Sequence, residues 1–118
     1  MTTGTDISET IWDMKYRLKK VDGSPVDKSI QDTWKRVSRA VARAEKKSQR
    51  KYWEKEFSDL LTSQTFLPAG RILAGAGTKR KVTLFNCFVL GRIEDDLSSI
   101  FEHVKEAALT MQQGGGIG

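Results

Sequence analysis

The amino-acid sequence predicts an α/β fold, of the α+β kind within these 118 residues. Three patterns lead to this prediction: a short alternation of apolar and polar residues near the start, two stretches with apolar residues at helical spacing, and a continuous apolar run followed by an amphipathic stretch. A Pro and Gly pair at 68–70 separates a mostly helical region with an early strand, residues 1–65, from a region of loop, strand, helix and glycine loop, residues 66–118.

The early strand is predicted over residues 12–19. Four apolar residues occupy alternate positions there and polar residues fill the positions between them: Trp12, Met14, Tyr16 and Leu18. This period of two is typical of a half-buried strand. The turn-forming residues at 22–25, Asp-Gly-Ser-Pro, end it.

Two helices are predicted to follow the turn. Asp27 or Ser29 caps the first, whose apolar residues recur at helical spacing: Ile30, Trp34, Val37, Val41 and Ala44. The second presents Trp53, Phe57, Leu60, Leu61 and Gln64 on one side. Residues 45–49 contain no apolar side chain and are expected to connect the two helices.

The second region is predicted to begin with a loop at residues 70–78, which hold three glycines. Residues 82–90 then form an apolar, β-branched and aromatic run, which suits a strand buried on both faces in a parallel sheet. Such a strand needs parallel neighbours, and we expect none from the rest of these residues. A capping box at Ser99–Glu102 is expected to start an amphipathic helix that ends in the glycines of 114–118.

Composition limits the classes of function. A single cysteine, Cys87, excludes an internal disulfide and favours a reducing compartment. One His and one Cys make a structural zinc site unexpected, and no metal ligand is assigned. The polar start shows no signal peptide, and no apolar run approaches the length of a membrane helix. We therefore expect a cytoplasmic protein with no membrane partner.

Residues 35–51 form a basic face. Eight of them are Lys or Arg and one, Glu45, is acidic, within a chain of net charge +5. One interpretation is a surface that binds nucleic acid. The other, which we favour, is a solvated helix face, because charge runs usually face solvent and no aromatic residues are interleaved for base stacking. Nucleic acid is thus not expected as a partner.

Two features of the second region carry possible chemistry. Cys87 lies in the middle of the apolar run and is either an inert core thiol or a redox thiol that faces a pocket. The glycines at 114–118 are either a linker and helix stop or a loop whose bare backbone approaches a ligand. The residues alone leave both pairs of alternatives open.

Several motifs in one order resemble the N-terminal part of the adenosylcobalamin-dependent (class II) ribonucleotide reductases. The motifs are IWDMKYR at 11–17, DTWKRV at 32–37, FLPAGRILAGAGT at 66–78, VTLFNCFVLG at 82–91 and KEAALTMQQGGGIG at 105–118. The resemblance covers nearly the whole chain. It implies that residues 66–118 begin a ten-stranded α/β barrel, with the first strand–helix unit present and the barrel incomplete.

The resemblance also implies a function: reduction of ribonucleotides to deoxyribonucleotides by thiyl-radical chemistry. Cys87 matches the first cysteine of the reducing pair, which is oxidised to a disulfide and restored by a thioredoxin-type partner. Asn86 matches a substrate-contacting position, and Gly115 and Gly116 match the glycine loop that borders the substrate.

The remaining parts of such a site are expected beyond Gly118. They comprise the radical cysteine, the second reducing cysteine, the catalytic Asn and Glu, and the adenosylcobalamin surface. The chain would then need the remaining C-terminal part of the reductase and be inactive alone. The alternatives are a small basic nucleic-acid-binding module and a reductase-derived assembly module without catalysis.

Overall fold

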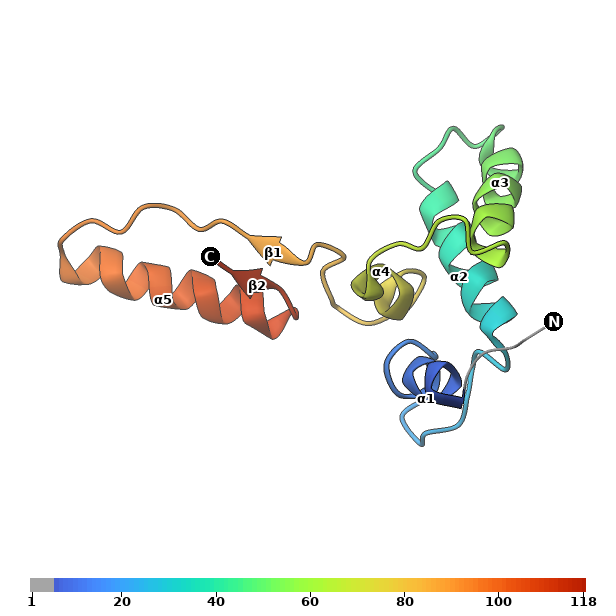
Figure 1. Cartoon of the computed structure of the whole chain (residues 1–118). Coiled ribbons are helices and arrows are strands. Elements are labelled where there is room, and N and C mark those ends of the chain that lie inside the picture. The colour runs from blue at the N-terminus through green and yellow to red at the C-terminus, as the bar shows by residue number, and fades with distance from the viewer. Residues whose placement is uncertain (1–5) are drawn as a thin grey trace. The chain divides into compact units, whose positions relative to one another are not determined.

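A computed structural model describes residues 6–118 of the chain. It consists of two compact units, Met1–Lys79 (the N-terminal unit) and Arg80–Gly118 (the C-terminal unit). The N-terminal unit contains helices α1 (Asp6–Lys15), α2 (Ile30–Ala42), α3 (Arg50–Thr62) and α4 (Gly70–Gly75), and the C-terminal unit contains strand β1 (Cys87–Phe88), helix α5 (Leu97–Gln112) and strand β2 (Gly116–Ile117) (Figure 1). Residues 6–118 are thus mostly helical, with one small parallel sheet.

The strand predicted over residues 12–19 is wrong, because helix α1 occupies its first half, residues 12–15, and a turn follows. Trp12 and Tyr16 stand four residues apart, so an alternating pattern of this length also places them on one side of a helix. That side faces the rest of the unit: the Trp12 Nε1 donates to the Thr33 Oγ1 at 3.0 Å, and Tyr16 packs against the core. Only a single antiparallel bridge, between Lys19 and Pro25, remains of extended structure there.

The two predicted central helices are confirmed as α2 and α3, and they lie side by side in opposite directions (Figure 1). Ser29 is the N-cap of α2, and the Asp32 carboxylate accepts hydrogen bonds from the backbone amides of Lys28 and Ser29 at 2.9 and 3.3 Å. These bonds satisfy amides that a helix start leaves unpaired. Residues 43–49 connect the helices, so the connection starts two residues before the predicted 45–49 and Ala44 lies outside α2.

The hydrophobic core of the N-terminal unit joins α2, α3 and α4. Its buried members are Trp34, Val37, Leu61, Leu73 and Ala76. The loop predicted over residues 70–78 is therefore corrected in its first part, because residues 70–75 fold into α4 and bury Leu73. Because Leu73 and Ala76 pack into this core, α4 belongs to the N-terminal unit. The division between the two units falls after Lys79, whereas the sequence places it after residue 65.

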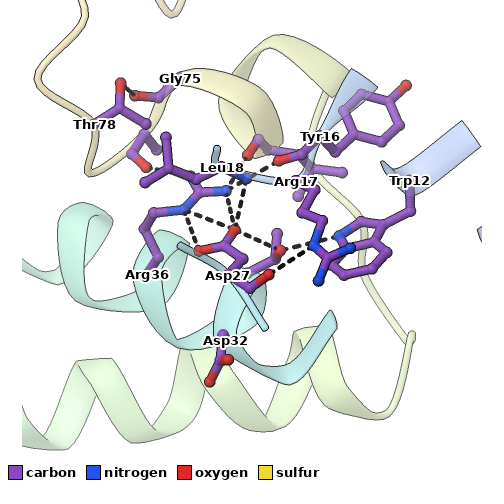
Figure 2. A network of polar contacts seen from close by, with 12 residues as sticks. Trp12, Tyr16, Arg17, Leu18, Asp27, Asp32, Arg36, Gly75 and Thr78 are labelled. Carbon is purple, nitrogen blue, oxygen red and sulfur yellow. Dashed lines mark hydrogen bonds and ion pairs between the residues drawn. The ribbon is translucent and has the colours of Figure 1, made fainter. Parts of the chain in front are cut away.

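A buried ion pair fastens the N-terminal unit together (Figure 2). The Asp27 residue is 3% exposed, and the Arg36 Nη2 donates to its Oδ2 at 2.9 Å. The same guanidinium donates to the backbone carbonyl oxygens of Ala76, Leu73 and Tyr16 at 2.6, 3.0 and 3.2 Å. Arg36, placed on the basic face from the sequence, thus points inward and links the end of α1 and the α4 segment to α2.

The electrostatics of Asp27 follow from these contacts. Burial alone raises the pKa of its carboxyl, since the charged form loses hydration. Hydrogen bonds from Arg36, from the Thr33 hydroxyl and from the Leu18 amide outweigh burial and hold the pKa of Asp27 below its usual value. The carboxylate is therefore ionised in the folded unit at neutral pH.

The C-terminal unit is a small β–α–β crossover. Strands β1 and β2 pair in parallel, with Cys87 opposite Gly116 and Phe88 opposite Ile117, and α5 connects them. The expectation that the apolar run has no parallel neighbour is wrong, because the glycine-rich segment supplies one. The strand is also shorter than residues 82–90, since only 87–88 pair regularly, and it is not buried on both faces: Val89 is 94% exposed.

The start of α5 also differs from its prediction. Asp96 is the N-cap and its carboxylate accepts from the Ser99 amide at 2.9 Å, so the helix begins one turn before the predicted capping box. Asp96 takes this place because the acidic turn at 94–96 offers a side-chain acceptor earlier in the chain. None of the helices in the described residues combines the length and apolar character needed to span a bilayer.

Candidate functional site

Strand β1 presents Cys87 as an exposed free thiol. The interpretation of Cys87 as a packed core cysteine therefore does not describe this structure. Directly across the sheet lies Gly116, and a Cβ built on Gly116 would stand 3.3 Å from the Cys87 Sγ and 3.3 Å from the Asn86 carbonyl oxygen. Glycine at this position lets the β2 backbone approach the thiol closely.

Backbone hydrogen bonds fix this approach. The Gly116 amide donates to the Asn86 carbonyl at 2.8 Å, and the Gly118 amide donates to the Phe88 carbonyl at 3.0 Å. The Leu90 amide in turn donates to the Gly118 carbonyl at 3.2 Å. The bonds run on both sides of Cys87, so its position relative to the glycine segment is set by the backbone ladder.

Gly115 is buried at the turn from α5 into β2. A Cβ on Gly115 would lie 2.7 Å from the Phe88 Cε2 and 2.9 Å from the Thr110 Cγ2, distances that no real Cβ contact sustains. The preceding residue, Gly114, has a φ of +85°, in the left-handed region that favours glycine. The glycine run is thus required by the end of α5 as much as by any ligand.

The two sides of β1 differ. The Phe88 side faces α5 and borders a cavity of about 150 Å³, lined also by Thr83, Leu109, Thr110 and Gln113. Successive residues of a strand point to opposite faces, so Cys87 lies on the face away from α5. The thiol is therefore open to a reactant on one face, while the helix covers the other.

The structure brings together all four residues singled out from the sequence: Asn86, Cys87, Gly115 and Gly116. Asn86 is exposed beside the thiol and contributes its carbonyl to the sheet. Sequence reasoning missed Phe88 and Thr110, which enclose Gly115. For Phe88, the only indication was the alternation along 86–88, which places it on the strand face opposite Cys87. Nothing in the sequence indicated Thr110.

The arrangement suits thiol chemistry. Cys87 offers a thiol, a group that can act as nucleophile or reductant, against a backbone wall and with access from solvent. Within residues 6–118, no group of three or more His, Cys, Asp and Glu side chains is placed to hold a metal ion.

The basic face belongs to the N-terminal unit, whereas Cys87 belongs to the C-terminal unit. Arg36 is withdrawn from this face into the buried ion pair. Arg39 pairs with Glu54 at 3.2 Å on the surface. An exposed ion pair of this kind is typical of a solvated helix face.

Comparison with known proteins identifies the family. Residues 3–81 match the model of the ribonucleotide reductase all-alpha domain. The chain is 36% identical over 112 residues to a vitamin B12-dependent ribonucleoside-diphosphate reductase of Mycobacterium tuberculosis, an alignment that covers 92% of the chain and 16% of that relative. It is 34% identical over 85 residues to the alpha subunit of a ribonucleoside-diphosphate reductase of Chlamydia pneumoniae, covering 72% of the chain and 8% of the relative.

A third relative, the large subunit of a ribonucleoside-diphosphate reductase of Vaccinia virus, is 36% identical over 63 residues, or 53% of the chain and 8% of the relative. The chain thus spans about a sixth or less of the length of these curated relatives. With a family model that covers most of its length, and relatives aligned over nearly all of it, the chain belongs to the ribonucleotide reductase family.

Proposed function

We propose that this chain is the N-terminal part of a ribonucleotide reductase and supplies one reducing cysteine and part of the substrate wall. The observation that carries the proposal is the exposed Cys87 thiol beside the backbone of Gly116, in a member of this family. In this proposal β1 and α5 are the first strand–helix unit of a ten-stranded α/β barrel, and the N-terminal unit is the helical domain that precedes it.

The reduction balances with two thiols. The C2′–O bond of the ribose breaks, its hydroxyl leaves as water, and a C2′–H bond forms. Two cysteine thiols give up two electrons and two protons and become a disulfide. A thiyl radical on a third cysteine removes the 3′ hydrogen and returns it, so it is not consumed. Cys87 supplies one of the two reducing thiols, and because the chain has a single cysteine, the others come from the remaining part of the enzyme.

The described residues contribute positioning to this reaction. Asn86 borders the substrate beside the thiol, and the backbone of Gly115 and Gly116 forms the adjoining wall. The absence of a side chain on Gly116 leaves room for a ribose ring to approach the Cys87 Sγ. A wall made of backbone on a hydrogen-bonded ladder holds the thiol and the sugar in a fixed relation.

The names of the Mycobacterium relatives support adenosylcobalamin as the radical source of the complete enzyme. The described residues do not fit this group: the cavity of about 150 Å³ beside Phe88 is far too small for a corrin ring. None of these residues is assigned to cobalamin binding.

The partners follow from the same proposal. They are a ribonucleoside diphosphate as substrate, the remaining C-terminal part of the reductase, and a thioredoxin-type protein that reduces the disulfide between turnovers. In this proposal the enzyme supplies deoxyribonucleotides for DNA replication and acts in the cytoplasm.

A hybrid enzyme tests the function. This chain replaces the aligned segment of the Mycobacterium tuberculosis reductase, and deoxyribonucleotide is measured with adenosylcobalamin, a ribonucleoside diphosphate and dithiothreitol. We expect turnover in the hybrid, none from the isolated chain, and loss of turnover in the Cys87→Ser hybrid. An Asp59→Asn hybrid is the control, because Asp59 lies in the N-terminal unit and forms an exposed ion pair with Lys55. Full turnover by the Cys87→Ser hybrid would overturn the proposal.

A further inference from the structure

We propose that Phe88 is a positioning residue for Cys87: its ring holds the glycine segment in the register that places Gly116 against the thiol. The inference deepens the proposed function and rests on it for its role in catalysis. The geometric part concerns the C-terminal unit alone and is testable without turnover.

Phe88 lies in close contact with Gly115. The Phe88 ring and the Thr110 methyl enclose the Gly115 Cα so closely that a Cβ there would stand 2.7 and 2.9 Å from them. Gly115 also donates its amide to the Thr110 carbonyl at 3.0 Å. The residue is therefore clamped between β1 and the end of α5.

Gly115 directly precedes Gly116, the residue that lies against the thiol. With Gly115 clamped, the Gly116 amide reaches the Asn86 carbonyl at 2.8 Å, and the Gly116 Cα faces the Cys87 Sγ. A one-residue slip in a parallel pair would replace Gly116 by a neighbour and turn the opposite face toward Cys87. The sheet has only two residues in each strand, so its ladder alone specifies this register weakly.

The surroundings of the ring make it the main support on this side. Phe88 borders the cavity of about 150 Å³, so part of the space next to the ring is not filled by other side chains. Phe85, 72% exposed, touches the ring edge-on at a centroid distance of 6.1 Å. Truncation of Phe88 would enlarge the cavity and leave Gly115 held by Thr110 alone.

The experiment measures the glycine segment and the thiol in the full chain. Hydrogen exchange is followed at the Gly116 and Gly118 amides, and the rate of Cys87 alkylation by iodoacetamide is measured at one pH. We expect Phe88→Ala to raise both rates. Exchange should rise about tenfold because it follows the local opening of β2, and alkylation should rise because the Gly116 backbone shields one side of the exposed thiol. Phe88→Leu, which keeps an apolar branched side chain, restores most of the protection, and Val89→Ala leaves both rates unchanged.

A double-mutant cycle separates positioning from a general loss of structure. Gly115→Ala introduces the clash with Phe88 and is expected to raise the alkylation rate in the parent chain, but by a smaller factor in the Phe88→Leu chain. Additive effects, unchanged rates in Phe88→Ala, or unprotected Gly116 and Gly118 amides in the parent chain would each overturn the inference.

The two proposals fail separately. If Phe88→Ala changes the thiol rate while the Cys87→Ser hybrid still turns over, the proposed function is wrong and the positioning contact stands. If the Cys87→Ser hybrid is inactive and Phe88→Ala alters neither rate, the function stands and Phe88 has no positioning role.

Discussion

The two units of the chain differ in how much of their apolar side-chain surface they bury. In the described residues, the N-terminal unit holds all the buried hydrophobic side chains except Ala107, and it adds a buried ion pair. The C-terminal unit exposes large apolar residues along its whole length: Val82, Leu84, Phe85, Val89, Ile93, Leu97, Ile100, Phe101, Val104, Leu109, Met111 and Ile117. A segment of under about 40 residues rarely builds a core without help. The candidate site thus lies in the unit that has the weaker support of its own.

The ion pairs of the two units differ in burial in the same way. The Asp27 and Arg36 side chains are only 4% and 9% exposed, whereas the ion pairs Arg92–Glu94 and Lys105–Glu102 of the C-terminal unit lie on the surface. Surface pairs add little to stability, but loss of one partner of a buried pair leaves an uncompensated charge. Unit-specific stability measurements therefore test the comparison directly.

The largest expected effect is that of Asp27→Asn. Removal of the carboxylate charge leaves Arg36 buried without its partner, which should cost about 3–5 kcal/mol of unfolding free energy. Urea unfolding followed by tryptophan fluorescence measures it, since Trp12, Trp34 and Trp53 all lie in the N-terminal unit. The control is Asp59→Asn, which breaks the exposed pair with Lys55 and should change little. Equal effects of the two substitutions would contradict the assigned role of the buried pair.

A pair of leucines compares the units next. Leu61 is 4% exposed in the core of the N-terminal unit, and Leu97 is 71% exposed at the start of α5. Leu61→Ala should cost about 2–5 kcal/mol through lost burial and a cavity, while Leu97→Ala should stay within about 0.5 kcal/mol. Urea unfolding followed by far-ultraviolet circular dichroism registers both units. A loss of several kcal/mol of unfolding free energy in Leu97→Ala would show that Leu97 belongs to a core in the C-terminal unit.

Acid should weaken the N-terminal unit in a defined direction. The folded-state pKa of Asp27 lies below its ordinary value of 3.8, so the folded state binds fewer protons than the unfolded state near that pH. The stabilisation is complete above the ordinary value and is lost as the pH falls through the folded-state pKa. The urea concentration at the unfolding midpoint should therefore decrease as the pH is lowered below about 4. The decrease should be less steep in Asp27→Asn. Some slope remains in the variant, because the pKa values of Asp13 and Asp22 are also lowered by hydrogen bonds. An identical slope in both proteins would argue against Asp27 as a source.

The smallest effect is expected from removal of the C-terminal unit. A chain of residues 1–79 keeps the whole described core and the ion pair, so its tryptophan-detected urea midpoint should equal that of the full chain. Its solubility should rise, because the exposed apolar side chains of α5 are gone. A lower midpoint or loss of cooperativity in the shorter chain would show that the two units depend on each other.

Local patterns were enough for the elements with a long, regular period. Helices α2, α3 and the body of α5 were predicted because their apolar residues recur over three or four turns. The short elements were not. Residues 12–19 alternate as a strand does, but Trp12 and Tyr16 are also about one helical turn apart. The structure places residues 12–15 in α1, where Trp12 contacts Thr33. Likewise, three glycines predicted a loop where burial of Leu73 supports α4.

The sequence by itself determined the family, through motifs that occur in one order. It also determined the candidate site residues, because the chain has a single cysteine and a distinct glycine run at 114–118. Tertiary structure decided how these residues meet. It paired Gly116 with Cys87 across a parallel sheet, enclosed Gly115 between Phe88 and Thr110, and drew Arg36 away from the basic face to Asp27. Each of these contacts joins residues that no local period relates, and each depends on burial and hydrogen bonds that form only when distant segments fold together.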